Sequence, residues 1–181
     1  MQERTLLLIK PDAMKRKLAG EIIKRYEAED LQITALKMVL PTREIAEKHY
    51  TDSEQQIVGM GNKTLTATGA ERAKELFGTD DATELGKKLR EFLVVFLTSG
   101  PLIAMVLEGE DVIQRVRKIA GFTNPPKADK GTIRGDMGID SIEQANEEGR
   151  ATENLVHTSG SPEEAEYEIS VWFREDEILK I

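Results

Sequence analysis

The residues of this chain best suited to chemistry lie in one short stretch near the C-terminus, residues 154–162. The stretch contains His157, one of two histidines in 181 residues. It runs from a short apolar segment, Leu155-Val156, into a helix start where Ser161 serves as the cap and Glu164 completes a capping box. We therefore expect a histidine on a loop between the end of a strand and the beginning of a helix.

The helix that follows is expected to place Glu168 beside this histidine. Apolar residues recur at helical spacing and should face the core: Ala165, Ile169, Trp172 and Phe173. Glu168 falls at the edge of that apolar face. A carboxylate held one helix away from a histidine is typical of an oriented imidazole. The alternative, which the spacing leaves open, is a surface loop histidine and a solvated glutamate.

Length and composition restrict the class of protein. A chain of 181 residues with 39% hydrophobic content is expected to form one domain, residues 1–181, with a proper core. The longest apolar run, residues 92–97, is too short to span a bilayer, and no signal peptide is visible, so a cytoplasmic location is expected. The absence of cysteine excludes disulfides and thiolate metal sites. A net charge of −8 disfavours general nucleic-acid binding but permits a local basic pocket for a small phosphate ligand.

Hydrophobic periodicity predicts strands that alternate with helices. Strands are expected at residues 5–9, 31–40 and 102–107, and helices at 20–29, 41–50, 70–77, 85–97 and 111–120. This alternation favours an α/β sandwich over a helical bundle.

The pattern weakens between residues 51 and 82. Residues 59–64, Gly-Met-Gly-Asn-Lys-Thr, briefly resemble a phosphate loop. They lack the four-residue gap between glycines, and no strong hydrophobic strand precedes them. We interpret this segment as an inserted helical hairpin.

Several polar side chains lie at element ends or in loops, and they share the ability to bind phosphate or hydroxyl groups: Lys10, Arg117, Thr123, Arg134 and Asn154. Each alone is expected to be an ordinary surface residue. Together with His157 they form a phosphate site next to a nucleophile. Charge-assisted bonds from lysine and arginine contribute about 1.5–3 kcal/mol each, so three or four hold a polyphosphate against the unfavourable overall charge.

The same motifs carry a family resemblance. They are Lys10-Pro11-Asp12, Gly20-Glu21-Ile22-Ile23, His49-Tyr50, Ser99-Gly100-Pro101, Thr123-Asn124-Pro125, residues 131–136 (Gly-Thr-Ile-Arg-Gly-Asp) and residues 154–159 (Asn-Leu-Val-His-Thr-Ser). In this order, and over nearly the whole chain, they resemble nucleoside diphosphate kinase.

The resemblance implies transfer of the γ-phosphoryl group from a nucleoside triphosphate to a nucleoside diphosphate by a ping-pong mechanism. His157 matches the histidine that carries the group. Glu168 and Ser159 match the residues that orient its ring, although the sequence does not tell which ring nitrogen each constrains. Tyr50 matches the tyrosine beside the histidine.

The resemblance also implies the remaining contacts. Lys10 matches a lysine that reaches the ribose and the phosphates, and Asn154 matches the asparagine on the ribose hydroxyl. The phosphate-binding set is matched by Arg117, Thr123 and Arg134. Mg²⁺ is implied as an ion that arrives with the nucleotide and has few protein ligands, so no metal-binding residue is expected. The implied fold is an α+β, ferredoxin-like βαββαβ sandwich, an antiparallel sheet covered by helices. The implied assembly is a homo-oligomer, with a hexamer favoured over a tetramer or dimer.

The sequence departs from the family pattern in ways that leave two points open. An insertion at about 51–82 disturbs the region of the base clamp, where Leu89 or Phe92 is a candidate. A second insertion at about 140–152 separates Asp136 from Asn154. Gly160 replaces the usual aspartate, from which we expect altered loop rigidity and retained chemistry. The alternative function is a catalytically silent nucleotide-binding or regulatory module on the same fold, and nucleic-acid binding is a third, disfavoured one.

Overall fold

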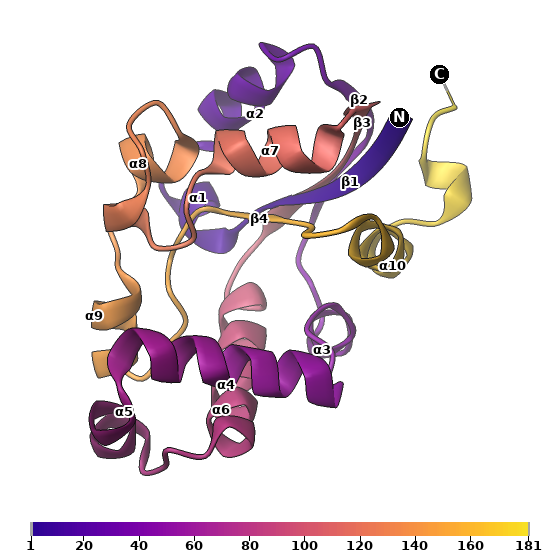
Figure 1. Cartoon of the computed structure of the whole chain (residues 1–181). Helices are drawn as coiled ribbons and strands as arrows, with labels where there is room; N and C mark the ends of the chain where they lie inside the picture. Colours follow the sequence, from indigo (N-terminus) through magenta and orange to yellow (C-terminus); the bar gives the residue numbers. More distant parts are fainter. Residues whose placement is uncertain (1, 181) are drawn as a thin grey trace.

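The computed structural model describes residues 2–180 and contains one four-stranded sheet. Strands β1 (Gln2–Ile9), β2 (Gln32–Val39), β3 (Leu102–Glu110) and β4 (Val156–Thr158) lie in the order β2-β3-β1-β4, and every neighbouring pair is antiparallel. The sheet order and the helical connections are those of a ferredoxin-like α+β sandwich, as the resemblance implied (Figure 1).

Helices cover both faces of the sheet because the buried strands are apolar on both sides. In β1, Leu7 and Ile9 pack against helices α2 (Ala19–Glu27) and α7 (Val112–Ala120). The intervening Leu6 and Leu8 pack with α3 (Arg43–His49), α6 (Ala82–Leu97) and α10 (Pro162–Trp172) on the opposite face. This alternation is the two-residue period of a strand buried on both faces. Within residues 2–180 no helix is long and apolar enough to cross a membrane.

Further elements connect this framework. They are α1 (Pro11–Lys15), α4 (Glu54–Thr68), α5 (Ala70–Phe77), η1 (Pro125–Lys127), α8 (Ile133–Met137), α9 (Ile142–Glu147) and η2 (Glu175–Glu177). The predicted helix at 70–77 has the bounds predicted for it. Residues 59–64 lie inside α4, so the helical interpretation of this segment is confirmed and the residues form no phosphate loop.

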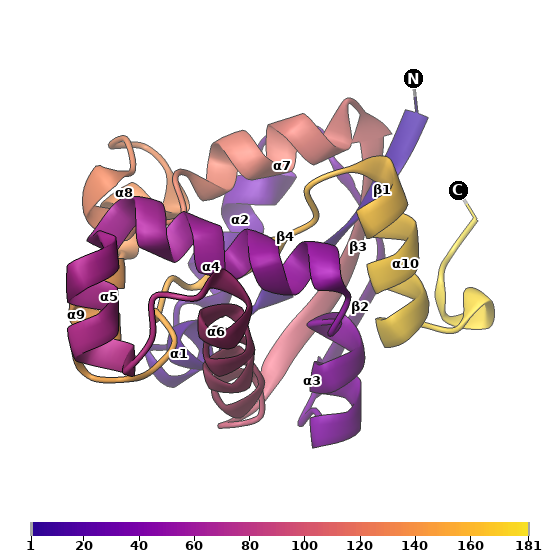
Figure 2. The same cartoon turned by 60° about the horizontal axis from the view of Figure 1, so that its bottom comes forward.

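The first insertion differs from a simple hairpin because α4 packs along α6 as well as meeting α5 (Figure 2). Two glycines permit this close approach. A Cβ atom on Gly61 would overlap the backbone carbonyl of Ala82, and one on Gly86 would overlap that of Ile57. The glycines at these positions therefore serve helix–helix contact.

This contact predicts opposite effects for two neighbouring glycines in α4. Gly61→Ala is expected to lower the free energy of unfolding by about 2 kcal/mol or more, because the two helices must separate. Gly59→Ala is the matched control: nothing lies within 4 Å of its added Cβ, so higher helix propensity should raise stability by about 0.5–1 kcal/mol. Urea unfolding of both variants measures the difference. Equal effects would contradict the close packing of α4 on α6.

The two insertions contact each other on one side of the molecule. Arg72 of α5 donates to Glu147 of α9 at 3.3 Å, and Asn146 donates to Thr68 at 3.4 Å. The second insertion is anchored at its base by Asp140, a buried carboxylate that accepts two bonds from Arg150, at 2.6 and 3.0 Å. Together the inserted segments form a wall beside the sheet.

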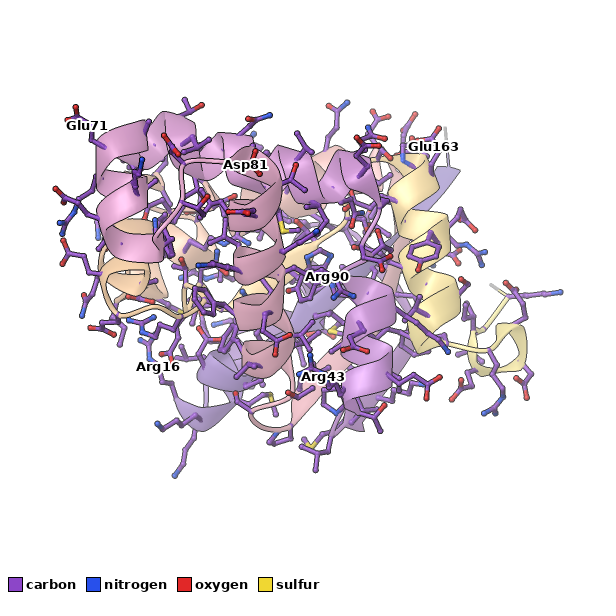
Figure 3. The ribbon with its side chains drawn as sticks, turned by 90° about the horizontal axis from the view of Figure 1, so that it is seen from below. Arg16, Arg43, Glu71, Asp81, Arg90 and Glu163 are labelled. Atoms are coloured by element: carbon purple, nitrogen blue, oxygen red, sulfur yellow. The ribbon has the colours of Figure 1, made fainter. Side chains whose placement is uncertain are left out.

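Arg90 fixes the position of α6 relative to α3. Its guanidinium donates to the backbone oxygens of Tyr50, at 2.6 Å, and Glu47, at 3.1 Å. Figure 3 shows Arg90 between the two helices. These bonds satisfy carbonyl groups at the C-terminal end of α3, where the helix leaves them without partners. They also hold Tyr50 at the edge of the site described next.

Candidate active site

An open cleft of about 2030 Å³ lies between the wall of insertions and the segment that runs from α7 to α8. Nearly all the side chains predicted to act together line it: Lys10, Tyr50, Leu89, Arg117, Thr123, Arg134, Asn154, His157 and Glu168. Ser159, the remaining one, is fully buried behind Glu168. The tertiary structure therefore brings together residues that are up to 158 positions apart in the chain.

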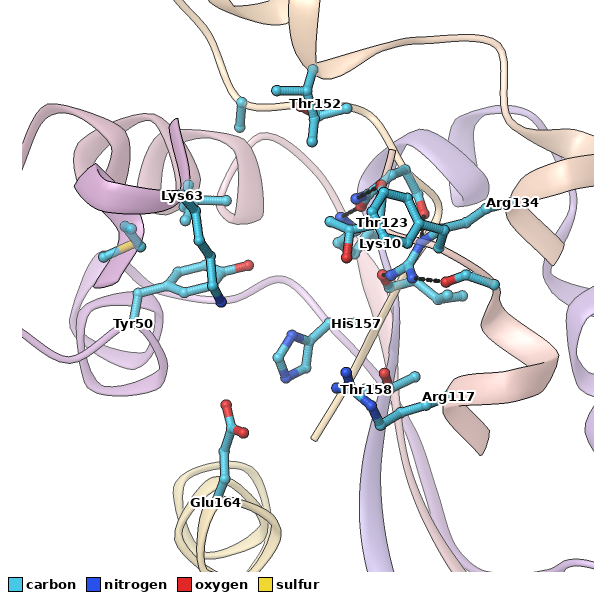
Figure 4. A pocket seen from close by; sticks show the side chains of 18 of the residues that line it. Lys10, Tyr50, Lys63, Arg117, Thr123, Arg134, Thr152, His157, Thr158 and Glu164 are labelled. Carbon is cyan, nitrogen blue, oxygen red and sulfur yellow. Dashed lines mark hydrogen bonds between the residues drawn. The ribbon is translucent and has the colours of Figure 1, made fainter. Parts of the chain in front are cut away.

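His157 lies in strand β4 itself, where it pairs with Leu8 of β1, so its placement on a loop is corrected. The strand is short because Leu155, directly before it, has a left-handed backbone with φ +72°. Backbone hydrogen bonds to the neighbouring strand hold a residue that lies inside a strand. The backbone of His157, and with it the imidazole, is therefore more restricted than it would be in a loop. His157 is thereby presented at the centre of the cleft (Figure 4).

Glu168 and Ser159 orient the ring of His157 through a chain of hydrogen bonds. Glu168 Oε1 lies 2.7 Å from Nε2 of His157, and the Ser159 hydroxyl donates to Glu168 Oε2 at 2.6 Å. Ser159 Oγ in turn accepts from the backbone N–H of Leu6 at 3.3 Å. The alternative of a solvated glutamate is therefore wrong: Glu168 is 3% exposed and bonded at both oxygens.

The charge of Glu168 decides which nitrogen of His157 is available. Burial acts to raise the pKa of Glu168, but the positive charge and hydrogen bond of His157, together with the Ser159 bond, lower it to about 2. An ionised carboxylate only accepts hydrogen bonds, so Nε2 of His157 carries the proton in this network. The lone pair of the neutral ring is then on Nδ1. This assignment answers the question that the sequence left open.

A second histidine, His49, completes the support of the ring and was not among the predicted site residues. Its ring packs edge-on against His157, with 4.4 Å between centroids, and its Nδ1 accepts from Trp172 Nε1 at 3.3 Å. Burial, followed by the nearby positive charge of His157, lowers the pKa of His49 to about 3, so the ring is neutral near pH 7. The rarity of histidine in this sequence was the available signal for its involvement.

Lys10 lies where β1 ends and is almost completely buried. Its ammonium donates to Asn154 Oδ1 and lies 5.1 Å from the centroid of the Phe96 ring. Burial lowers the pKa of Lys10 to about 8, against the opposing attraction of Asp12. Asn154 is held in turn by a 2.8 Å bond from its Nδ2 to the Thr123 carbonyl. Lys10 and Asn154 therefore hold each other in place in the wall of the cleft.

The two predicted phosphate-binding arginines differ in how much of each guanidinium is free. Arg134 is buried and donates to the carbonyls of Asn154, Gly121 and Val156, at 3.1, 2.7 and 2.7 Å. Burial lowers its pKa to about 10. Arg117 is exposed, and its guanidinium has no hydrogen-bond or ion-pair partner within residues 2–180. Arg134 therefore supports β4 and keeps two N–H groups free, whereas all five N–H groups of the Arg117 guanidinium are available to a ligand.

The family model for nucleoside diphosphate kinase matches residues 3–69 and 58–178. A nucleoside diphosphate kinase from Pyrobaculum aerophilum is 50% identical over 98% of both chains, and one from Methanocaldococcus jannaschii is 39% identical over 99% of both. The chain belongs to the nucleoside diphosphate kinase family.

Solved structures of this family have the same fold. The crystal structure of an NDP kinase from P. aerophilum has a TM-score of 0.95 and 47% identity, and covers 99% of this chain and 100% of that one. A Borrelia burgdorferi nucleoside-diphosphate kinase, described as a transition-state mimic with bound vanadate and ADP, has a TM-score of 0.79 and 29% identity, with coverages of 99% and 92%.

Gly160, which replaces the aspartate usual in nucleoside diphosphate kinases, is anchored by a neighbouring carboxylate. Its backbone N–H donates to Glu164 Oε2 at 2.7 Å, so Glu164 bonds to the residue before the helix cap and the expected capping box is only half formed. A Cβ at position 160 would lie 2.5 Å from that oxygen and 3.5 Å from Nη1 of Arg117. The carboxylate of Glu164 thus lies close to the place where the side chain of an aspartate at position 160 would begin. The hydrogen bond from the Gly160 N–H to this carboxylate restrains the loop, although glycine itself is flexible.

Helix α6, which follows the first insertion, supplies the part of the cleft that the family pattern left unassigned. Leu89 and Phe92 of α6 line it, and both pack with the small apolar cluster under α5. Tyr50 lies at the end of α3 with its ring 4.6 Å from that of His49, and burial raises the pKa of its hydroxyl. Leu89 and Phe92 therefore both line the cleft, and a contact of either with the base stays a prediction.

Proposed function

We propose that this chain transfers the γ-phosphoryl group of a nucleoside triphosphate to a nucleoside diphosphate through a phosphohistidine on His157. The observation that carries the proposal is the pairing of Nε2 with the ionised Glu168, which leaves the lone pair of Nδ1 to attack phosphorus. As the Nδ1–P bond forms, the bond from the γ-phosphorus to the bridging oxygen breaks and the diphosphate leaves with that electron pair. The acceptor diphosphate then attacks the phosphohistidine in the reverse sense.

The remaining side chains are proposed to bind the nucleotide. Lys10 and Asn154, which already contact each other, are placed to bind the ribose hydroxyl and the phosphates together. Arg117 and Thr123, with the free N–H groups of Arg134, bind the phosphate chain. Leu89 is assigned to the base, where it contributes an apolar surface. These contacts reach ribose and phosphates more than base edges, so several bases are expected to be accepted.

Mg²⁺ is proposed to be bound mainly by the nucleotide. Within residues 2–180 the side chains that cluster at metal-binding distances are His49, His157 and Glu168. That set is rich in nitrogen and already hydrogen-bonded, whereas Mg²⁺ requires oxygen ligands in octahedral geometry. The residues present fit an ion held by phosphate oxygens and water, and bound in this way it would neutralise developing charge on the phosphates.

The relatives that match nearly the whole chain are named as kinases, and nothing in them favours the silent-module alternative. We also infer one domain for residues 1–181, with insertions at 51–82 and 140–152, because the first and last strands are neighbours in the sheet. A cytoplasmic location stays a prediction.

The proposed chemistry is tested by incubating the protein with γ-labelled ATP in the absence of an acceptor. The label should become attached to the protein, be lost in acid, survive base, and pass to added GDP. These are the properties of phosphorus bonded to an imidazole nitrogen, in contrast to a phosphoester. Nucleotide binding without label would instead support a catalytically silent module.

A homo-oligomer is proposed from exposed apolar side chains at the β2 edge of the sheet. Strand β2 is an edge strand, and Leu36, Met38 and Leu40 in or next to it are 49%, 63% and 70% exposed. An edge with apolar side chains is a ready surface for pairing with a second copy. We expect light scattering to give a multiple of 20.2 kDa, with a hexamer favoured over a tetramer or dimer, and Met38→Glu to reduce that mass. A monomer at micromolar concentration in the unaltered protein would contradict the proposal.

A further inference from the structure

The inserted helix α4 presents one of its faces to the cleft. The residues on this face are Gln55, Gln56, Gly59, Met60, Lys63 and Thr64. Another face carries Ile57 and Gly61, which contact α6 through the close helix–helix approach described above. Because that approach depends on the absence of a side chain at Gly61 and Gly86, it fixes the rotation of α4 about its axis. The direction in which the cleft-lining side chains leave the helix is fixed with it.

Lys63 is the one cationic residue in α4, and it lies on the cleft face. The structure between residues 2 and 180 shows no carboxylate within 4 Å of its ammonium group and no hydrogen-bond acceptor for it. By contrast, the arginine of each insertion is paired with two carboxylates, Arg72 with Glu75 and Glu147, and Arg150 with Asp140 and Glu148. A charge without a partner on the wall of a cleft is available to an anionic ligand.

The position of Lys63 relative to the nucleophile indicates which part of a ligand it meets. Figure 4 shows Lys63 descending from α4 past the ring of Tyr50, on the side of His157 opposite to Arg117. Arg117 is likewise without a partner among the described residues. Two unpaired cations thus flank the imidazole, one from the framework and one from the insertion. Such an arrangement attracts the most highly charged group of a ligand, its terminal phosphate.

We propose that Lys63 binds the terminal phosphate oxygens of the nucleoside triphosphate, from the face of the cleft opposite Arg117. The inference rests on the proposed function of the site and adds to it a cation supplied by the first insertion. An ammonium on a flexible stem forms point-charge contacts with oxygens that move during transfer, whereas the planar arginine fork favours one fixed geometry. The first insertion therefore contributes a side chain that binds the nucleotide.

The inference is tested with Lys63→Met, which removes the charge and retains helix propensity and side-chain length. Kinetics with ATP and GDP should show kcat/KM lowered by about tenfold, the effect of one charge-assisted contact, with most of the change in KM. The dependence of kcat/KM on ionic strength should also weaken, because one attractive charge has been lost. Lys63→Arg should retain most of the activity.

Lys74→Met is the matched control. Lys74 lies on the neighbouring inserted helix α5, is exposed, and does not line the cleft. The control changes the net charge equally and should leave KM and its salt dependence unchanged. Melting temperatures of both variants should equal that of the unaltered protein, since neither lysine has a hydrogen-bond or ion-pair partner among residues 2–180.

The outcomes separate this inference from the function on which it rests. If the unaltered protein forms the labelled phosphohistidine and Lys63→Met has the same KM and salt dependence, Lys63 is a solvated surface residue and the inference is overturned. If both lysine variants change KM equally, the effect is one of net charge and the inference is again overturned. If the unaltered protein takes up no label, the proposed function has failed, and Lys63→Met with unchanged ATP affinity would overturn the inference as well.

Discussion

Replacing His157 with alanine is expected to abolish formation of the phosphorylated protein and to lower phosphoryl transfer by a factor on the order of 10⁴ or more. The reason is that no other described side chain combines a free ring nitrogen with a position at the centre of the cleft. His49 is neutral, but it is buried and its Nδ1 is occupied by the bond from Trp172. Quantitative labelling with γ-labelled ATP and steady-state transfer to GDP measure the two effects.

His49→Ala is the matched control, since it removes the other histidine and leaves the nucleophile. It should retain the label and much of the transfer rate. Because His49 is packed between His157, Tyr50 and Trp172, its removal leaves a cavity that lowers stability, so both variants should be assayed well below their melting temperatures. Substantial turnover in His157→Ala, or loss of label in folded His49→Ala, would refute the assignment.

Replacing Lys10 with methionine is expected to lower kcat/KM by a factor of about 10² or more. Its ammonium is proposed to form two charge-assisted contacts, to the ribose and to the phosphates, each worth about 1.5–3 kcal/mol. Stability should change little, with a melting temperature within about 4 °C of the original, because the native state already holds this charge in a buried site. Transfer kinetics and thermal unfolding of the same preparation compare the two effects.

The pH profile provides an independent check on Lys10. Burial lowers its pKa from 10.5 to about 8, so the free enzyme loses this charge as the pH rises through 8, and kcat/KM should fall there. For stability the sign is opposite. Between pH 8 and 10.5 the unfolded chain binds the proton that the folded chain has released, so the unaltered protein gains stability relative to Lys10→Met as pH rises. Identical alkaline limbs in the two proteins would contradict a role for the Lys10 charge.

Local sequence patterns were sufficient for most of the secondary structure. The helix at 70–77 and the strand that begins the sheet follow from periodicity, and the cap at Ser161 follows from a residue type at one position. The predicted position of Glu168 at the edge of a buried helical face is also confirmed. Such features depend on residues within a few positions of one another, because the side-chain periods of helices and strands repeat every 3.6 and 2 residues.

The sequence by itself therefore determined most of the elements, the family resemblance and, through that resemblance, nine of the side chains that line the cleft. The tertiary structure alone decided that Glu168 bonds Nε2 of His157, that His49 supports the ring, and that three N–H groups of Arg134 bind backbone carbonyls. It also decided that Gly61 and Gly86 let α4 approach α6 closely. Each of these facts depends on which atoms meet across the fold, between residues from 11 to 108 positions apart in the chain. Local spacing carries no information about that distance, because packing and hydrogen-bond geometry are set only when the whole sheet has formed.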